Sequence, residues 1–351
     1  MLRRHWPAYE RKFGQRLLPS HRRAVQCILQ CRTRALGGEV YRCQDCRTDH
    51  FVYHSCHHRA CPQCGHAEAT EWIEKQKLKL LPVPYYLITF TVPEGLRAWL
   101  RAHQKKGYAL LLRESAGALQ DVAANPKHLG AQIACLSVLH TWGRQLQYHP
   151  HVHCVVPAGG LRADGRRWLH PKSADFFLPQ IVLAARFRNR LNAQLKPGEH
   201  FQQIPASVWR QKWVVDVQPV GSGAAALKYL SAYVSRTALG HHRILGDERG
   251  KITFKYKDSG ERQWRTLTLS AHEFLRRFLQ HVLPKGFQRV RYYGWLGPAA
   301  TVRWQRLLAL LDWKPPLLSL APKPQPLCPR CGLKLCWIGT LERAPPARRR
   351  T

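Results

Sequence analysis

Acidic residues are scarce in this sequence. Its 351 residues include 21 Asp and Glu against 56 Lys and Arg, which gives a formal net charge of +35. Nucleases and transposases that use a carboxylate triad depend on acidic side chains, so the composition disfavours that class. The positive charge is spread along the whole chain and attracts polyanions, so we expect nucleic acid as the partner.

Long apolar runs are also missing. The longest, such as residues 80–92, are interrupted by proline and are too short to span a bilayer. No signal-peptide pattern opens the sequence. We therefore expect a soluble intracellular protein that does not use a membrane.

Two catalytic motifs are absent as well. The sequence has no His-Glu-x-x-His, the motif of many hydrolytic zinc enzymes, and no G-x-x-x-x-G-K-[ST] phosphate-binding loop. These absences disfavour a zinc hydrolase and a protein with its own ATPase.

Cysteine, by contrast, is plentiful. Six of the twelve cysteines form C-x-x-C pairs, which in an intracellular protein indicates metal binding rather than disulfides. Two such pairs, Cys43 with Cys46 and Cys61 with Cys64, follow each other closely. Each pair places two thiolates on one turn, so together they predict a tetrahedral zinc site. The zinc is structural, because so small a module cannot build much core without it.

The remaining cysteines leave a second zinc site open. Cys31 and Cys56 are its candidate ligands, and His54, His57, His58 or His66 could complete it. Alternatively, Cys27 and Cys31 are buried thiols one helical turn apart. Near the C-terminus, Cys328, Cys331 and Cys336 supply three thiolates, one short of a closed site.

Proline and charge patterns predict the domain boundaries. A charged helix over residues 66–81 is stopped by Pro82 and Pro84, which places the end of a zinc-binding, DNA-binding domain at residue 82. Residues 83–318 then form the central domain. A basic, Pro-rich tail with a partial cysteine cluster covers residues 319–351.

The central domain contains a His-x-His strand. Alternating β-formers predict strands over 85–92, 131–139 and 151–156, the last two antiparallel neighbours. Because alternate side chains share a face, His151 and His153 point the same way, about 7 Å apart. Such a pair predicts a clamp for a divalent metal. His140 is the candidate third ligand across the strand pair, with His149 or Gln147 as alternatives.

A helix predicted over residues 224–238 carries two tyrosines. Tyr229, Tyr233 and Arg236 are spaced to share one face, and Lys228 lies beside them. A metal-held phosphodiester and a tyrosine hydroxyl are the parts needed for transesterification of DNA. Lys228 and Arg236 are candidate phosphate contacts that also favour deprotonation of tyrosine. Alternatively, the tyrosines only pack against the sheet.

These motifs together resemble a known family. His151-Val-His153 followed by Tyr229-x-x-x-Tyr233 is similar to the HUH single-strand endonucleases, and more closely to the two-tyrosine rolling-circle transposases of bacterial insertion sequences. The zinc-domain motifs Tyr53-x-x-Cys56 and Arg59-x-Cys61-Pro-x-Cys64 match that family too. The family often has His before Cys61, where this chain has Ala60, so a second zinc site would need His57 or His58.

The resemblance implies a fold, a chemistry and a setting. It implies an α+β protein in which a five-stranded antiparallel sheet flanked by helices follows a small cysteine zinc-binding domain. It also implies structural Zn²⁺, catalytic Mg²⁺ or Mn²⁺, and 5′-phosphotyrosyl intermediates on single-stranded DNA. Duplex DNA at the element ends and target is the other implied partner, in the bacterial cytoplasm and associated with the nucleoid.

Two other functions share these features. A non-catalytic zinc-dependent DNA-binding protein, such as a decayed transposase, would have the same zinc domain and charge. A replication-initiator nickase or a conjugative relaxase would share the HUH chemistry. The intact His151, His153, Tyr229 and Tyr233 argue against the first, and the missing ATPase motif disfavours the second.

Overall fold

The computed structural model of the chain describes residues 1–64, 66–173, 176–234, 238–258, 260–261, 263–317 and 325–344. At residues 66–69 and 229–234 it describes the backbone but not the side chains. Its contacts divide the chain into two compact units. One unit comprises the described residues of Met1–Glu68, Ser235–Val282 and Ser319–Thr351, and the other those of Ala69–Val234 and Leu283–Leu318.

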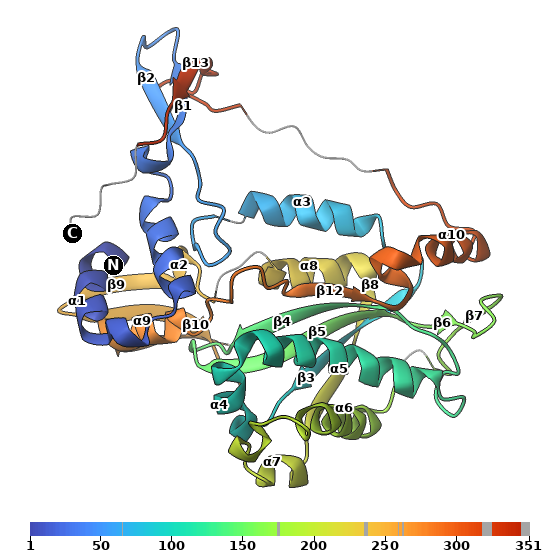
Figure 1. The fold of residues 1–351 in the computed structure, drawn as a ribbon. Helices are drawn as coiled ribbons and strands as arrows, with labels where there is room; N and C mark the ends of the chain where they lie inside the picture. The colour runs from blue at the N-terminus through green and yellow to red at the C-terminus, as the bar shows by residue number, and fades with distance from the viewer. Residues whose placement is uncertain are drawn as a thin grey trace. The chain divides into compact units, whose positions relative to one another are not determined.

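A five-stranded sheet forms the centre of the second unit, with strand order β12-β4-β5-β3-β8 and every neighbouring pair antiparallel (Figure 1). Its strands are β3 (Pro84–Thr91), β4 (Cys135–Trp142), β5 (Tyr148–Pro157), β8 (Val214–Ser222) and β12 (Val290–Tyr293). The predicted five-stranded antiparallel sheet flanked by helices is thus confirmed.

One face of this sheet carries the main core. Ile88, Phe90, Val152, Cys154 and Val156 are buried on it. The helices that cover this face are α4 (Glu94–Ala102), α5 (Gln104–Ala124) and α6 (Gln180–Leu195), with the short α7 (Ser207–Arg210) beside them. Because successive side chains of a strand point to opposite faces, the residues between these, such as Thr89 and His153, lie on the other face.

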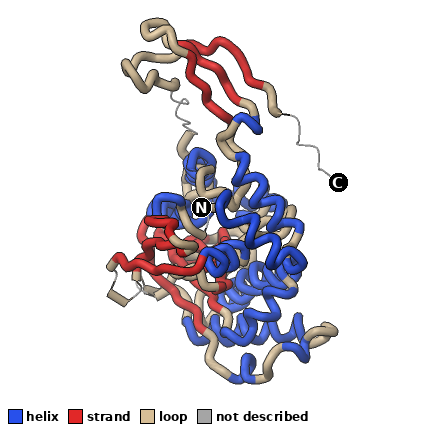
Figure 2. Tube along the Cα trace, turned by 90° about the vertical axis from the view of Figure 1, so that its left-hand side faces the viewer, coloured by secondary structure: helices blue, strands red, loops and turns tan. Residues whose placement is uncertain are grey.

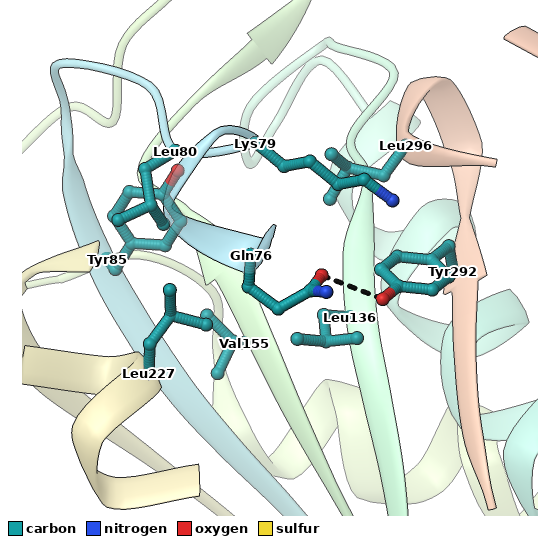
Figure 3. Close-up of a pocket in the computed structure, with 9 residues that line it drawn as sticks. All are labelled: Gln76, Lys79, Leu80, Tyr85, Leu136, Val155, Leu227, Tyr292 and Leu296. Carbon is teal, nitrogen blue, oxygen red and sulfur yellow. Dashed lines mark hydrogen bonds between the residues drawn. The ribbon is translucent and has the colours of Figure 1, made fainter. Parts of the chain in front are cut away.

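The opposite face is covered by α8 (Gly223–Val234) and α3 (His66–Lys77). Leu87, Val138 and Val155 of the sheet pack against Ala226 and Leu227 of α8. Figure 3 shows a pocket of about 20 Å³ where α3, α8 and the sheet meet, roughly the space of one water.

Polar contacts at this pocket hold the α3 segment in place. The Tyr292 hydroxyl donates to Oε1 of Gln76 at 2.7 Å, and Nζ of Lys79 lies 4.0 Å from the Tyr292 ring centre (Figure 3). Because the pocket is small and largely apolar, its role is packing rather than ligand binding.

An ion-pair network joins α5 to α6. Glu114 is only 2% exposed and accepts from Nε of Arg113 at 2.6 Å and Nε of Arg190 at 2.9 Å. Arg190 also donates to Asp121 at 2.6 Å. The absence of a side chain at Gly117 makes room for Arg190, since a Cβ there would lie 2.4 Å from Nη2 of Arg190.

Arg190→Ala is expected to destabilise this unit by about 3 kcal/mol, the lower end of the range for breaking a buried pair, because Arg113 still bonds Glu114. The measurement is the urea midpoint followed by circular dichroism. Arg188→Ala, on the same helix, is the control and should change stability by less than about 0.5 kcal/mol. Equal effects of both substitutions would contradict a special role for the network.

The first unit combines segments that are distant in sequence. Helices α1 (Leu2–Phe13) and α2 (Pro19–Gln30) belong to it, together with a sheet of β9 (Ile244–Glu248), β10 (Lys251–Lys257) and β11 (Trp264–Ser270), and helix α9 (Ala271–Leu279). Tyr9 and Phe13 of α1 contact the His272 ring of α9. Asp247 accepts from Nε2 of His5 at 2.6 Å and pairs with the amino group of Met1 at 3.2 Å. The start of the chain is thereby anchored to β9.

A three-stranded ribbon completes the first unit. Its order is β13-β1-β2, formed by β1 (Gly38–Arg42), β2 (Asp49–Tyr53) and β13 (Cys336–Leu341), and it is seen at the top of Figure 2. Glu39 of β1 accepts from the Trp337 indole of β13 at 2.6 Å. Strands from the two ends of the chain therefore share one sheet.

These contacts differ from the predicted domain boundaries at 82 and 318. The α3 segment packs on the central sheet through Trp72, Gln76 and Leu80, so it does not close the zinc-binding domain. Residues 238–282 belong with α1 rather than with the central sheet. Strand β13 pairs with β1, so the C-terminal segment joins the first unit instead of forming a separate tail. Among the described residues, no helix is long and apolar enough to cross a membrane.

Candidate active site

Three histidines meet on the α8-covered face of the central sheet. His140 of β4 pairs directly with His151 of β5, and His153 lies between Val138 and Thr89 of its two neighbouring strands. One ring nitrogen from each of the three histidines can be chosen so that all lie within 4.8 Å of one another. The histidine pair from the sequence and its predicted third partner are thus brought together.

Burial keeps these imidazoles neutral. His140 is 1% exposed and His153 is 6% exposed. Burial, together with the neighbouring imidazoles, lowers the pKa of both rings well below the usual value. Burial also lowers the pKa of His151 to about 4. At neutral pH all three rings can therefore offer a nitrogen lone pair, which is the form that binds a metal ion.

Hydrogen bonds and ring stacking fix the orientation of the three histidine rings. Nδ1 of His151 donates to the backbone carbonyl of His149 at 2.6 Å, so its Nε2 keeps the lone pair. Nδ1 of His153 is hydrogen-bonded to the Thr89 hydroxyl at 3.0 Å. The Trp142 ring stacks on His140 with 5.2 Å between centres. Such contacts orient metal-binding histidines in known sites.

The alternative third ligands are engaged elsewhere. Nη2 of Arg97 donates to Nδ1 of His149 at 3.0 Å. Oε1 of Gln147 accepts from the backbone of Gln145 at 2.9 Å. Among the described residues, the cluster therefore consists of His140, His151 and His153.

The tyrosine helix is α8. Strand β8 ends at Ser222, opposite Pro84 and at the far end of β3 from Thr91. From there α8 turns back over the sheet on the histidine face (Figure 1). Lys228 is exposed. The side chains of Tyr229 and Tyr233 and the whole of Arg236 lie outside the described residues, so the prediction that they share a face stays a prediction.

Two residues near the cluster were missed by the sequence reasoning. Thr89 fixes the ring of His153, and Asp216 of β8 pairs with Thr89, which places this carboxylate on the same face. The strand alternation of β3 and β8 was the available signal. That alternation could not show that Thr89 and Asp216 lie beside the histidines, because the order of the strands was unknown.

Eight of the twelve cysteines form two groups of four, each with its sulfur atoms within 4.8 Å of one another. Cys31, Cys56, Cys61 and Cys64 form the first, with 3.1 Å between the sulfurs of Cys31 and Cys64. Burial raises the pKa of the Cys61 thiol to about 12 in the absence of a metal. This donor set fits a structural zinc ion, which binds thiolates and would displace their protons.

The predicted pairing of the two C-x-x-C turns was wrong. Cys43 and Cys46 lie with Cys328 and Cys331, not with Cys61 and Cys64. The predicted ligands Cys31 and Cys56 join Cys61 and Cys64 without any histidine. Cys27 and Cys336 belong to neither group. The strand pairing of β1 with β13 explains the exchange, because it brings the C-terminal cysteines beside Cys43.

Known transposases are similar to this chain over most of its length. Residues 1–92 match the family model for "Transposase zinc-binding domain" of the IS91 type, and residues 135–303 match the model for "Putative transposase". The chain is 38% identical over 318 residues to "Putative transposase y4qJ" of Sinorhizobium fredii, covering 85% of this chain and 79% of that one. It is 29% identical over 290 residues to the transposase for insertion sequence element IS801 of Pseudomonas savastanoi pv. phaseolicola, covering 78% and 69%.

Among solved structures, a conjugative relaxase, TrwC, determined with oriT DNA and without metal, aligns with 65% of this chain and 72% of its own. The sequence identity is 14% and the TM-score 0.25. That likeness is too low to support an argument about this chain.

Proposed function

Since this chain belongs to the family of insertion-sequence transposases with an IS91-type zinc-binding domain, we propose that it nicks and rejoins single-stranded DNA through tyrosine esters in rolling-circle transposition. The observation that carries this proposal is the cluster of three buried, neutral histidines on the sheet face covered by the tyrosine-bearing helix α8. We place this action on bacterial DNA in the cytoplasm, associated with the nucleoid.

The histidines are proposed to hold a catalytic divalent cation. His140, His151 and His153 supply three convergent nitrogens, and water or phosphate oxygens would complete the coordination of Mg²⁺ or Mn²⁺. When bound, the cation would draw charge from the non-bridging oxygens of the scissile phosphate. The three histidines would hold the cation at β4 and β5, and the sheet would make that position rigid.

Tyrosine is the proposed nucleophile. A hydroxyl of Tyr229 or Tyr233 attacks phosphorus in line, the bond from phosphorus to the 3′ oxygen breaks, and that oxygen takes a proton to leave as a 3′-hydroxyl. The 5′ phosphate remains esterified to tyrosine, and attack by another 3′-hydroxyl reverses the reaction. An unperturbed tyrosine has a pKa of about 10, so a nearby cation such as Lys228 or Arg236 is proposed to favour loss of its proton.

Binding is proposed to rest on the basic surface rather than on the histidines. One hollow of about 650 Å³ in the first unit is lined at the end of α1 and the start of α2 by Arg11, Lys12, Arg16 and Arg22. Arg22 also pairs with Glu10, which leaves the other three as the proposed phosphate contacts. Such contacts give affinity that falls steeply with salt.

The alternatives predict different chemistry. A non-catalytic zinc-dependent DNA-binding protein would not need a buried cluster of three histidines. A replication-initiator nickase would cut and rejoin at one origin without moving a second DNA end. The match to transposase models over both regions favours transposition.

The test is covalent capture. Labelled single strands from the flanks of the protein's own gene are incubated with the full-length protein and Mn²⁺, and then separated under denaturing conditions. We expect a labelled protein that resists heat and detergent and is lost on digestion of the protein. No adduct on either flank, with DNA binding intact, would favour the non-catalytic alternative.

A further inference from the structure

The cysteine group at the three-stranded ribbon draws its members from the two ends of the sequence. Cys43 and Cys46 follow β1, while Cys328 and Cys331 precede β13. The sulfurs of Cys43 and Cys331 lie 3.5 Å apart although the residues are 288 positions apart in the chain. We propose that these four cysteines bind a second zinc ion, which fastens the C-terminal segment 325–344 to the N-terminal zinc-binding region.

The two turns have the same backbone geometry. The amide of Cys43 donates to the carbonyl of Thr48 at 3.0 Å, and the amide of Cys328 donates to that of Leu333 at 2.8 Å. Each bond spans five residues. The fourth residue after the first cysteine has a positive φ in both turns, 52° at Arg47 and 77° at Gly332. Two such turns, each with a pair of thiols, can supply the four ligands of a tetrahedral zinc site.

The surroundings of the four sulfurs fit a metal site. Cys43 and Cys328 are buried, whereas Cys331 is exposed, so the site lies at the surface with an open path for a metal ion. Nε2 of His50 lies 3.5 Å from the sulfur of Cys328, close enough for a hydrogen bond of the kind that supports thiolate ligands.

The ribbon has only a small apolar core among the residues that the structure describes. Its buried apolar cluster consists of Cys43, Cys328 and Leu335, with Tyr41 and Cys46 packed beside it. Phe51 and Trp337 are largely exposed. Modules with so little core are usually held by metals or disulfides. In a reduced intracellular setting a tetrahedral set of four thiolates selects zinc or iron, and zinc is the common structural choice.

Two of the four ligands lie outside the residues that the family models match. Cys43 and Cys46 lie within the matched zinc-binding region, residues 1–92. Cys328 and Cys331 lie outside both matched regions. The C-terminal segment therefore completes a metal site of which the zinc-binding region alone holds only half the ligands.

The experiment compares zinc content among full-length variants by native mass spectrometry and metal analysis. Wild type is expected to hold two zinc ions per chain. The double variant Cys328→Ser/Cys331→Ser and the variant Cys43→Ser/Cys46→Ser should each lose one. Cys336→Ser is the matched control, because this cysteine lies in the same segment but outside the group, and it should keep wild-type zinc.

A second measurement tests the proposal if the cysteine variants fold poorly. Wild-type protein prepared with Co²⁺ should have the visible absorption of tetrahedral thiolate sites, and a variant truncated after residue 317 should have about half of that intensity. Wild-type zinc in Cys328→Ser/Cys331→Ser would overturn the proposal. So would iron in the purified protein, or an intact mass that reports a disulfide among these cysteines.

Discussion

Replacing His151 with alanine is expected to abolish nicking of single-stranded DNA, with a loss of roughly 10³-fold or more in rate, since a metal at a phosphoryl centre supplies several kcal/mol. The same loss is expected for His140→Ala and His153→Ala, because all three nitrogens converge. DNA affinity should change little, since Lys and Arg contacts to phosphate dominate it. Gel-based nicking and filter binding at fixed salt measure the two quantities.

The control is the histidine next to the cluster. His149→Ala removes a ring that is held by Arg97 and lies outside the group of three. It should retain most nicking, because the variant keeps the backbone carbonyl that orients His151. Nicking that survives both His151→Ala and treatment with EDTA would rule out the metal role.

Loss of both tyrosine hydroxyls is expected to eliminate the covalent adduct entirely. Tyr229 and Tyr233 are one turn apart on α8, roughly 6 Å along the axis, so both could act in turn at one phosphate. Tyr229→Phe and Tyr233→Phe should each keep metal and DNA binding but lose transposition, because displacing one strand while joining another requires two ester links. Adduct capture and a transposition assay in cells measure these effects.

Tyr85→Phe is the matched control for this series. Its hydroxyl lies on the same sheet face but accepts from the amide of Leu81 at 2.8 Å, so its loss should leave the adduct unchanged. An adduct formed by the double tyrosine variant would refute the nucleophile assignment. If only one single variant impairs transposition, the enzyme uses one tyrosine and the other is a neighbour that packs.

Local patterns were enough to predict that His140, His151 and His153 meet. The alternation along β3 and β5 identified the buried strands, and the short return between β4 and β5 placed His140 opposite His151. Those features depend on neighbours in sequence, so a single sequence contains them. Asp216 was missed because its place beside Thr89 depends on the order of strands, which alternation does not determine.

The grouping of the zinc ligands could not be predicted from local patterns. Two C-x-x-C turns close in sequence form a short loop, so pairing Cys43 with Cys61 was the simplest prediction. The structure instead pairs Cys43 with Cys331, because β13 adds to the edge of β1. Nothing within a window of local sequence marks β13 as the partner of β1. The assignment of residues 238–282 to the N-terminal unit was missed for the same reason.

The pairing of β1 with β13 also has a consequence for synthesis of the chain. Ribosomes add about 5–20 residues per second, so roughly 15–60 s pass between the emergence of Cys46 and that of Cys331. Throughout that interval one edge of β1 has no partner strand, and the nascent N-terminal region exposes it to other chains. A protein made from a truncated or interrupted message would keep that edge open permanently. The three-stranded ribbon can therefore form only after translation has passed residue 341.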